Sequence, residues 1–349
     1  MDLHHHGDTE TGPGLLDFAV NVYAGPRPAW LEAALLEGIA ASSAYPDAAP
    51  ARAALAGRHR RTVDEVLPTA GAAEACTLVA RLRPWRRPVV VHPQFTEPHA
   101  ALEAAGRHVT VALCRAGDGF RLRPSDVPGD ADLVVVGNPV NPTGVLHPAA
   151  AIRSLVRPGR LVVVDEAFLD AVPGEPETLA GEPGVLVLRS LTKHWSIPGI
   201  RAGYAIGEPA VIAGLAALQA SWSVSSPAIA AMVAIAGAAA ESARRARELT
   251  AWREQLETGL RDRGLAFPVS AAPFVLAKAG AGVHAALREE GVAVRRGGTF
   301  PGLDDSWVRI AARPPEQTGR LLEALDKVRA GPRVRAAGVR VAGVQATGA

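Results

Sequence analysis

The sequence predicts an α/β protein, in which a mostly parallel, doubly wound domain is followed by a smaller α+β domain. Runs of apolar, largely β-branched residues recur along the chain, and helix-like segments separate them. A strand covered by helices on both faces is apolar throughout, so these continuous runs indicate buried parallel strands. With 349 residues, 48% of them hydrophobic and 21% charged, the chain can bury a large core.

The elements of the larger domain alternate between strand and helix. We expect strands at residues 88–91, 133–136, 161–164 and 185–188, and helices at 74–82, 97–105 and 148–156. One long helix at 226–265 then carries the chain out of this domain. The smaller unit is expected to consist of short strands at 274–277, 292–295 and 307–311 and a helix at 315–328.

These elements divide the chain into four segments. Residues 1–44 are an N-terminal arm or small-domain segment, 45–240 the large domain that would hold a ligand, and 241–330 the small domain. Residues 331–349 contain no acidic or aromatic residue, and we expect this tail to be disordered.

Composition and charge exclude several classes of protein. A formal net charge of +2 is too small for a general nucleic-acid binder, which needs a concentrated basic surface. Cys76 and Cys114 lie in apolar stretches without metal-ligand spacing, so we expect buried free thiols and no metal site. The N-terminus shows no secretory signal, and the longest apolar run, 228–240, is too short to span a bilayer. We therefore expect a cytoplasmic protein without membrane or nucleic-acid partners.

The highest density of reactive side chains follows the last predicted strand of the large domain. Ser190, Thr192 and Lys193 come at the end of this strand, and Arg201 follows past a Pro-Gly turn. The carboxyl edge of a parallel sheet is where α/β proteins bind ligands. A nucleophilic lysine beside phosphate-binding groups suits a pyridoxal phosphate site, and a solvated surface loop is the alternative.

Four motifs in chain order resemble those of the fold-type I aminotransferases of class I and II. Residues 190–204 resemble the family signature S-x-[ST]-K-x-x-x-[IL]-x-G-[IL]-R-x-G-[YF]. Residues 137–144 (GNPVNPTG), 164–168 (VDEAF) and 70–74 (AGAAE) resemble its N-P-x-N-P-T-G loop, its D-E-A-[YF] segment and its glycine turn into a helix. The resemblance covers nearly the whole chain. It implies an aspartate aminotransferase-like fold, pyridoxal 5′-phosphate as cofactor and a homodimer with a shared active site.

The resemblance also implies which residues are catalytic. Lys193 is the Schiff-base lysine, which binds the cofactor and then carries protons. Asp165, at the end of a buried strand, pairs with the pyridine nitrogen and keeps it protonated, so that the ring can accept electrons. The alternative for Asp165 is a buried structural carboxylate.

Further motif residues are implied to hold the cofactor. The backbone N–H groups of Gly71, Ala72 and Ala73 at a helix N-terminus bind its phosphate, and Ser190 and Arg201 complete the cup. The remaining contacts are a hydrogen bond from Asn141 to the ring oxygen, stacking by Phe95, Phe168 in the place of a tyrosine, and Tyr45 reaching the phosphate of the neighbouring subunit. By their position alone, Phe95 could be a core residue and Tyr45 a loop residue.

The substrate site is implied by a late arginine and by the N-terminus. Arg309 matches the family arginine that binds the substrate carboxylate, with a surface arginine as the alternative. Residues 5–8 (HHGD), together with 95–97, 165–170, 197–199 and 300–303, resemble the L-threonine-O-3-phosphate decarboxylases of cobalamin biosynthesis. By that resemblance, the candidates for gripping a substrate phosphate are His6, Asn21, Arg295, Arg296 and Arg313. For the histidines, the remnant of a tag is the alternative.

Three functions follow from these observations. The expected reaction is decarboxylation of L-threonine O-3-phosphate to (R)-1-aminopropan-2-ol O-phosphate and CO2. The alternative is an aminotransferase of the histidinol-phosphate type, with 2-oxoglutarate and glutamate as the second pair. A non-enzymatic ligand sensor is the third, and the intact Lys193, Asp165 and Arg201 disfavour it. The choice between the two reactions depends on which bond stands perpendicular to the cofactor ring, and no sequence pattern shows that torsion.

Overall fold

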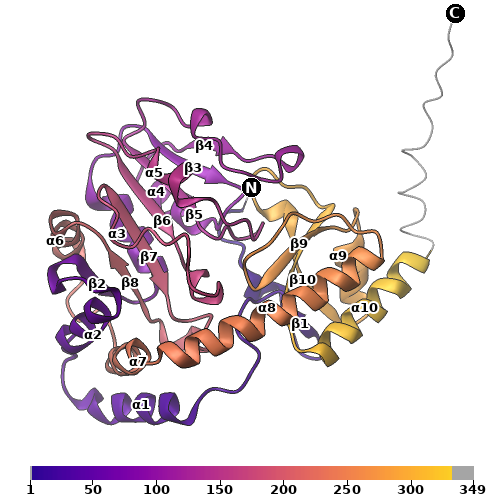
Figure 1. Ribbon diagram of the computed structural model, residues 1–349, viewed down its shortest axis with the longest axis horizontal. Helices are drawn as coiled ribbons and strands as arrows, with labels where there is room; N and C mark the ends of the chain where they lie inside the picture. The colour runs from indigo at the N-terminus through magenta and orange to yellow at the C-terminus, as the bar shows by residue number, and fades with distance from the viewer. Residues whose placement is uncertain (1, 332–349) are drawn as a thin grey trace, which may run out of the picture.

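The computed structural model describes residues 2–331 and divides them between a large α/β domain and a smaller α+β domain (Figure 1). The long helix α8 (Ala239–Asp262) begins beside the large domain and runs along the small one. This arrangement confirms the predicted fold class. The disorder expected for residues 331–349 concerns a segment that, beyond Gly331, lies outside the described residues.

A seven-stranded sheet forms the centre of the large domain. In sheet order its strands are β2 (Val66–Thr69), β8 (Gly203–Ile206), β7 (Val185–Ser190), β6 (Leu161–Asp165), β5 (Leu133–Gly137), β3 (Pro88–His92) and β4 (Thr110–Leu113). Strand β8 runs antiparallel to both of its neighbours, and the pairs from β7 to β4 are parallel. The four strands predicted from apolar runs are the adjacent strands β7, β6, β5 and β3.

Helices cover both faces of this sheet. On one face lie α3 (Ala72–Leu82), α4 (Glu97–Ala104) and α6 (Pro209–Leu218), packed against Leu186 and Leu188 of β7. On the other lie α2 (Ala49–His59), α5 (Ala149–Arg153) and α7 (Ser226–Ala236), packed against Val185 and Val187. Successive strand residues point to opposite faces, so each central strand supplies both cores and is apolar up to the polar residues at its carboxyl end.

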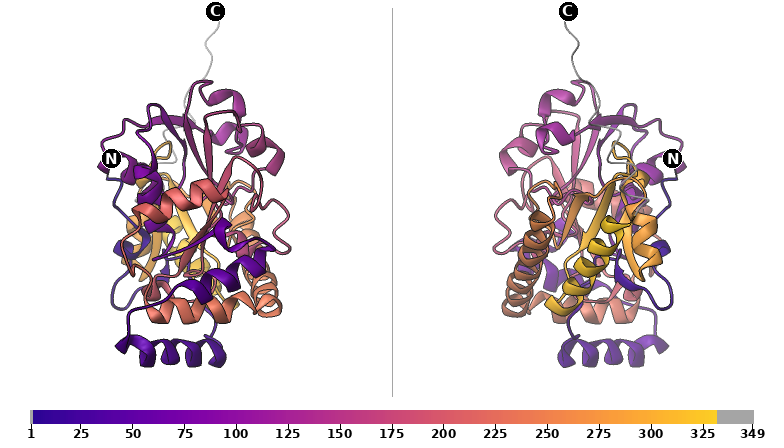
Figure 2. Two further views of the ribbon diagram at one scale, coloured as in Figure 1. Left: turned by 90° about the vertical axis from the view of Figure 1, so that its left-hand side faces the viewer. Right: turned by 90° about the vertical axis from the view of Figure 1, so that its right-hand side faces the viewer.

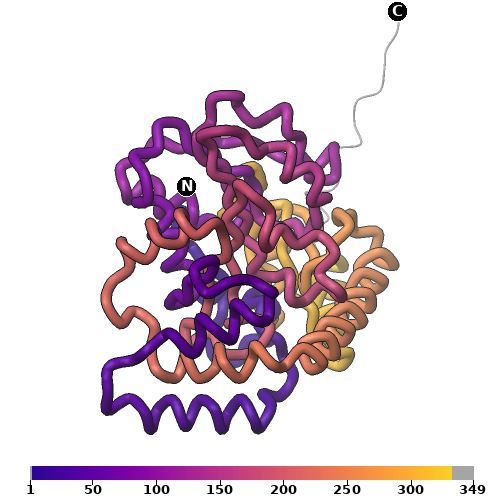
Figure 3. The backbone as a smooth tube through the Cα atoms, turned by 60° about the vertical axis from the view of Figure 1, so that its left-hand side comes forward, coloured from indigo at the N-terminus to yellow at the C-terminus, as the bar shows by residue number. Residues whose placement is uncertain are grey.

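The small domain combines one strand from the N-terminal segment with the C-terminal part of the described chain. Its sheet has the order β1 (Leu16–Phe18), β10 (Val292–Arg296), β11 (Trp307–Ala311) and β9 (Phe274–Lys278), and α9 (Val283–Glu289) and α10 (Pro315–Ala330) pack on it. Strand β1 pairs in parallel with β10, so the indigo N-terminal strand lies within the orange and yellow domain of Figure 1. The arm segment 1–44 is therefore divided, because α1 (Ala29–Ala40) packs on α7 of the large domain instead (Figures 2 and 3).

The single helix expected at 226–265 is wrong, because the chain bends by 87° between α7 and α8. Gly237 caps the end of α7, and α8 begins at Ala239. The two helices bury different faces: α7 packs apolar residues under the sheet, whereas the charged α8 lies along the small domain. Within residues 2–331, no single helix is long and apolar enough to cross a membrane, and this bent pair passes that test only as a pair.

Short 3-10 helices connect these elements. They are η1 (Gly7–Glu10), η2 (Ala41–Ser43), η3 (Val63–Glu65), η4 (Ala116–Asp118), η5 (Pro124–Asp126), η6 (Leu169–Ala171), η7 (Pro198–Ile200) and η8 (Gly297–Thr299). Two of them matter for the site described below. Helix η1 lies in the N-terminal arm, and η6 directly follows the loop after β6.

Candidate active site

The motif residues meet at the carboxyl edge of the large sheet. Asp165 ends β6, Ser190 ends β7, and Lys193 follows β7 in the next loop. These residues line an inner hollow, together with Ala72, Ala73, Cys76, Phe95, Asn141, Ala167, Phe168, Thr192 and Arg201. An outer cavity of about 440 Å³ shares Lys193 with this hollow and extends to the N-terminal arm and to Arg309 of the small domain.

One end of the inner hollow is built to bind a phosphate. Helix α3 begins after Gly71, whose φ of +81° suits glycine and few other residues. A Cβ on Gly71 would stand 2.6 Å from a terminal nitrogen of Arg201, so the guanidinium lies directly over this helix end. The Ser190 and Thr192 hydroxyls are 2.8 Å apart in the same place. Helix N–H groups, hydroxyls and a guanidinium together form an anion cup.

The surroundings of Lys193 shift its protonation equilibrium toward the neutral amine. Its Nζ donates to Thr192 Oγ1 at 3.4 Å. Burial, followed by the charges of Arg201 and Arg309, lowers the pKa of Lys193 to about 8. Near neutral pH an appreciable fraction of this lysine is therefore unprotonated, as a nucleophile or a proton acceptor must be.

Asp165 is a carboxylate with little stabilisation from the protein. Its Oδ1 accepts from the backbone N–H of Ala167 at 3.0 Å. Burial raises the pKa of Asp165 to about 6, although the Ala167 N–H and the charge of Lys193 oppose the rise. A protonated ring nitrogen is a suitable partner for such a buried carboxylate, because its positive charge would offset the free-energy cost of burying the negative one.

Arg309 brings the small domain into the site. It is 4% exposed and donates from NH1 to Asn141 Oδ1 at 2.5 Å and from NH2 to the carbonyl of Ala19. With the Asn21 amide oriented to satisfy both side chains, its oxygen also accepts from Arg309 at 3.0 and 3.2 Å. Burial, together with the nearby Arg295, lowers the pKa of Arg309 to about 9. An anionic group in the cavity would stabilise this buried cation.

Aromatic side chains line the two hollows. Phe95 lies between the inner hollow and the arm, and its ring centroid is 5.4 Å from that of His6. Phe168 lines both hollows and packs edge-on against Phe274 of β9 at 5.0 Å. Phe168 therefore contributes shape and no hydroxyl donor at this position.

Apart from Gly71 at the start of α3, four of the predicted residues do not line these hollows. Arg295 donates to the carbonyls of His5 and His6, and Arg313 donates to the carbonyls of Asp17, Val20 and Val22, so both guanidiniums hold the arm. Arg296 is the neighbour of Arg295 on β10 and is likewise absent from the cavity lining. Tyr45 is 78% exposed and stacks on Trp222 at 4.4 Å.

The N-terminal arm lines the outer cavity and contacts both domains. Glu10 accepts from His5 and His284, each at 2.9 Å, which ties the arm to α9. The carbonyl of Leu3 accepts from Thr96 Oγ1 at 2.6 Å, which ties it to the large domain. These long-range partners could not be found from sequence spacing.

Thr192, Glu97 and Asp8 also line the hollows, although the sequence had given none of them a role in the site. Thr192 is the second hydroxyl of the anion cup, and its place directly before Lys193 was the available signal. Glu97 and Asp8 both line the outer cavity, and Glu97 lies 3.6 Å from the His6 ring nitrogen. Both residues belong to motifs named in the sequence analysis. The pattern of those motifs does not show whether such a carboxylate lines a cavity or only stands at the start of a helix. Cys76 and Cys114 are buried free thiols, as expected.

A comparison with protein families matches residues 13–325 to aminotransferase class I and II. This match includes both domains and every motif that meets at the sheet edge. The chain belongs to the class I and II aminotransferase family. Its membership confirms the resemblance seen in the sequence.

Individual relatives differ in the activity that their names give. A histidinol-phosphate aminotransferase of Mycobacterium tuberculosis is 48% identical over 323 residues, covering 89% of this chain and 87% of its own. A threonine-phosphate decarboxylase of Salmonella typhimurium is 30% identical over 346 residues, covering 91% and 92%. The solved histidinol-phosphate aminotransferase of Clostridium acetobutylicum has a TM-score of 0.83 at 24% identity, covering 90% and 99%, and therefore shows the same fold.

The cofactor of this aminotransferase-family enzyme is pyridoxal 5′-phosphate. The residues of the inner hollow fit its parts: the cup at Gly71 and Arg201 suits the phosphate, Asp165 the ring nitrogen and Lys193 the aldehyde. A Cβ on Gly203 would lie 2.6 Å from the backbone nitrogen of Ala72, so β8 lies directly against the helix end that forms this cup.

Proposed function

We propose that this protein is an aminotransferase for a phosphorylated amino substrate of the histidinol-phosphate type, with 2-oxoglutarate and glutamate as the second pair. The observation that carries the proposal is the relative of that name, which is 48% identical along 89% of this chain. The proposal replaces decarboxylation as our main interpretation, because the decarboxylase relative is 30% identical.

The charges at the cavity support a substrate with two binding ends. Arg309 lines the same outer cavity as Arg201 of the cofactor cup and donates a hydrogen bond to Asn141. Its guanidinium fork suits a carboxylate or a phosphate, so it can hold glutamate in one half-reaction and the phosphorylated substrate in the other. His6 and Asn21 of the arm line the same space and would enclose the substrate.

The protein residues supply proton transfer and exclude water. When bound, pyridoxal phosphate draws electrons from the bond that is broken at the amino-bearing carbon. Lys193, with its pKa lowered to about 8, takes the proton from that carbon and returns it elsewhere in the substrate–cofactor unit. Asp165 maintains the charge of the ring nitrogen, and the arm limits access of solvent to the cavity.

Decarboxylation of threonine phosphate remains a second candidate because of one specific observation. The Salmonella typhimurium relative matches the chain over 91% of its length and is itself covered to 92%. In that reaction the substrate carboxylate would have to stand out of the ring plane, and the arm and Arg309 would have to hold the phosphate instead.

One experiment separates the two candidates. The purified enzyme, loaded with pyridoxal phosphate, is mixed either with histidinol phosphate and 2-oxoglutarate or with threonine phosphate alone. We expect glutamate to form in the first mixture and no CO2 to be released in the second. CO2 released in proportion to threonine phosphate, without any oxo acid, would overturn the proposal in favour of the decarboxylase.

We propose further that two copies of the chain build the active site together. Tyr45 is exposed and lies outside the cavity of its own chain, and the adjacent α1 exposes Leu36 and Ile39. A partner chain covering this surface would bury both features. Sedimentation equilibrium should show a dimer. Tyr45→Phe should weaken cofactor binding while the protein remains a dimer. A monomer that binds the cofactor tightly would contradict this proposal.

A further inference from the structure

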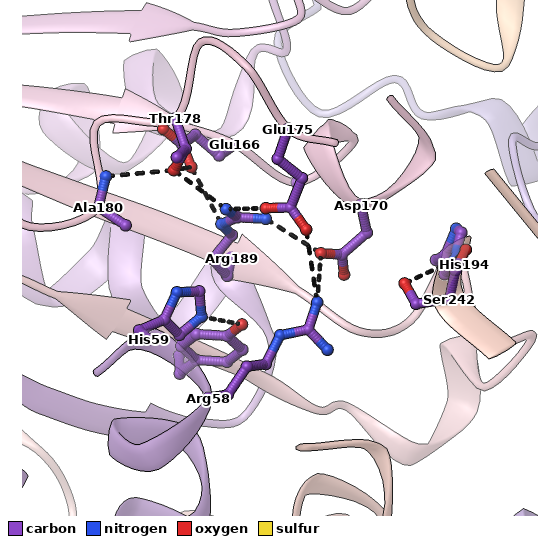
Figure 4. Close-up of polar contacts among 12 residues, drawn as sticks. Arg58, His59, Glu166, Asp170, Glu175, Thr178, Ala180, Arg189, His194 and Ser242 are labelled. Carbon is purple, nitrogen blue, oxygen red and sulfur yellow. Dashed lines mark hydrogen bonds and ion pairs between the residues drawn. The ribbon is translucent and has the colours of Figure 1, made fainter. Parts of the chain in front are cut away.

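A buried cluster of charges lies behind the cofactor site and takes no part in the chemistry described above. At its centre is Arg189, which is 1% exposed (Figure 4). Its Nε is 3.0 Å from Glu166, its NH1 is 3.0 Å from Asp170 and its NH2 is 2.5 Å from Glu175. A second guanidinium, that of Arg58 on α2, is 3.1 Å from Asp170. Each nitrogen of the central fork thus faces a different carboxylate.

The cluster is joined in sequence to the residues that hold the cofactor. Asp165 and Glu166 are adjacent at the end of β6, and Arg189 and Ser190 are adjacent at the end of β7. Successive strand residues point to opposite faces of a sheet. Asp165 and Ser190 therefore line the hollow on the α3 face, whereas Glu166 and Arg189 meet on the α2 face. The ion pair fixes the same two strand ends from behind.

The neighbours of the cluster leave it little freedom to rearrange. Glu166 also accepts from the backbone N–H of Leu179 at 2.7 Å and from the Thr178 hydroxyl at 2.9 Å. His59, next to Arg58, binds the Tyr204 hydroxyl at 2.9 Å. Burial, together with the charges of Arg189 and Arg58, lowers the pKa of His59 to about 3, so this histidine stays neutral and adds no positive charge.

We infer that Arg189 is a positioning residue for the cofactor, which acts through the ends of β6 and β7 and not through any contact with the cofactor. Its fork sets the relative position of Asp165 and Ser190, and so the distance between the ring-nitrogen site and the phosphate cup. A lysine at 189 would keep the charge but could not face three carboxylates in fixed directions. The inference requires only that the site binds pyridoxal phosphate, and it does not depend on which substrate the enzyme uses.

The chain offers a matched control for this role. Arg160, just before β6, is 6% exposed, and its nitrogens donate to the carbonyls of Ala131, Leu155, Pro128 and Gly129. It lies at the opposite end of β6 from Asp165. Arg160→Lys and Arg189→Lys therefore remove the same kind of buried fork from the two ends of one strand.

The test measures cofactor binding instead of turnover. The cofactor-free forms of Arg189→Lys and Arg160→Lys are titrated with pyridoxal phosphate, and the visible absorbance of each loaded enzyme is followed against pH. We expect the Kd for the cofactor to rise at least about tenfold in Arg189→Lys, with a shifted midpoint of the absorbance titration. Arg160→Lys should lower the melting temperature while leaving both quantities within about twofold of wild type. Equal cofactor binding in the two variants would overturn the inference.

A second variant covers the case in which Arg189→Lys does not fold. Glu166→Gln keeps the shape of the side chain and removes one ion pair from the cluster. It should weaken cofactor binding about threefold or more and move the absorbance midpoint in the same direction. Wild-type binding and an unmoved midpoint would show that the cluster stabilises the fold only. Because neither readout needs a substrate, failure of the proposed reaction would leave this result unaffected.

Discussion

The two faces of the large sheet treat charged side chains in opposite ways. On the α3 face, burial moves Lys193 and Asp165 toward their neutral forms, with pKa values of about 8 and about 6. On the α2 face, Arg189 and Asp170 are held in their charged forms, because each faces buried groups of opposite sign. Both sets lie at the ends of β6 and β7 or in the segments that directly follow them. The difference teaches that this sheet edge concentrates its stabilising pairs on one side and its reactive groups on the other.

The largest expected effect is on the reactive side. Lys193→Ala removes the group that binds the cofactor aldehyde and carries the proton, so turnover should fall at least about a thousandfold with either candidate substrate. Lys327→Ala, at an exposed position of α10, is the control and should behave as wild type. Substantial turnover by the Lys193 variant, measured as product formed per enzyme, would break the assignment of the reactive face.

The next effect is on the paired side. Asp170→Asn leaves Arg58 and Arg189 without a carboxylate that lies 3.1 and 3.0 Å from them, and should lower the free energy of unfolding by about 3 kcal/mol. Burial opposes its charge, but Arg58 and Arg189 lower the pKa of Asp170 below 3.8. Its stabilisation is therefore complete above pH 3.8 and lost below it. Chemical denaturation measures the change, and an unchanged unfolding curve at pH 7 would contradict the pairing.

At Asp165, the same change from aspartate to asparagine should raise the free energy of unfolding instead of lowering it. Its folded pKa of about 6 lies above the usual 3.8, so ionisation destabilises the cofactor-free fold as the pH rises through that interval. Asp165→Asn removes the charge and should stabilise the cofactor-free protein at pH 8 by about 1–3 kcal/mol, while turnover falls. Thermal unfolding of the cofactor-free forms at pH 4 and pH 8 checks this sign. An Asp165→Asn variant that is less stable than wild type at pH 8 would contradict the claim that the Asp165 charge destabilises the cofactor-free fold.

The smallest effect concerns the arm, where a paired carboxylate borders the reactive cavity. Burial disfavours the charged form of Glu10, yet the hydrogen bonds from His284 and His5 outweigh it and lower the pKa to about 2. Glu10→Gln should lower the free energy of unfolding by about 1 kcal/mol at pH 7. The difference from wild type should shrink as the pH falls from 4.5 toward 2. Urea titrations at several pH values measure this difference. A difference that is constant over this range would contradict stabilisation by an ionised Glu10.

Much of the fold could be predicted from the sequence because the central strands are buried on both faces. The runs at β3, β5, β6 and β7 are apolar at every position for that reason. Strand β4 was missed because it lies at the sheet edge, where Val111 and Leu113 are partly exposed and the pattern is short. The bend at Gly237 was missed because both flanking segments have helix-forming composition, and only their packing partners differ.

Within the site, the residues near the cofactor were predictable and the residues of the arm were not. Lys193, Asp165 and Arg201 stand in compact motifs, because a rigid cofactor needs donors at fixed places on neighbouring strand ends. Arg295 and Arg313 were equally good candidates by residue type. Their donors are directed to backbone carbonyls of a distant segment, and no local pattern encodes such a partner. The cluster around Arg189 joins α2 to three later segments and escaped notice for the same reason.

The pairing of β1 with β10 affects the order in which the protein can be completed during synthesis. Leu16 lies opposite Val292 in the small sheet, so β1 must wait for a strand that is synthesised much later. At about 5–20 residues per second, that delay is on the order of 15–60 seconds. Until then the apolar Phe18 has no partners from β10 to pack against. The catalytic cavity therefore cannot be completed before β10 has been synthesised.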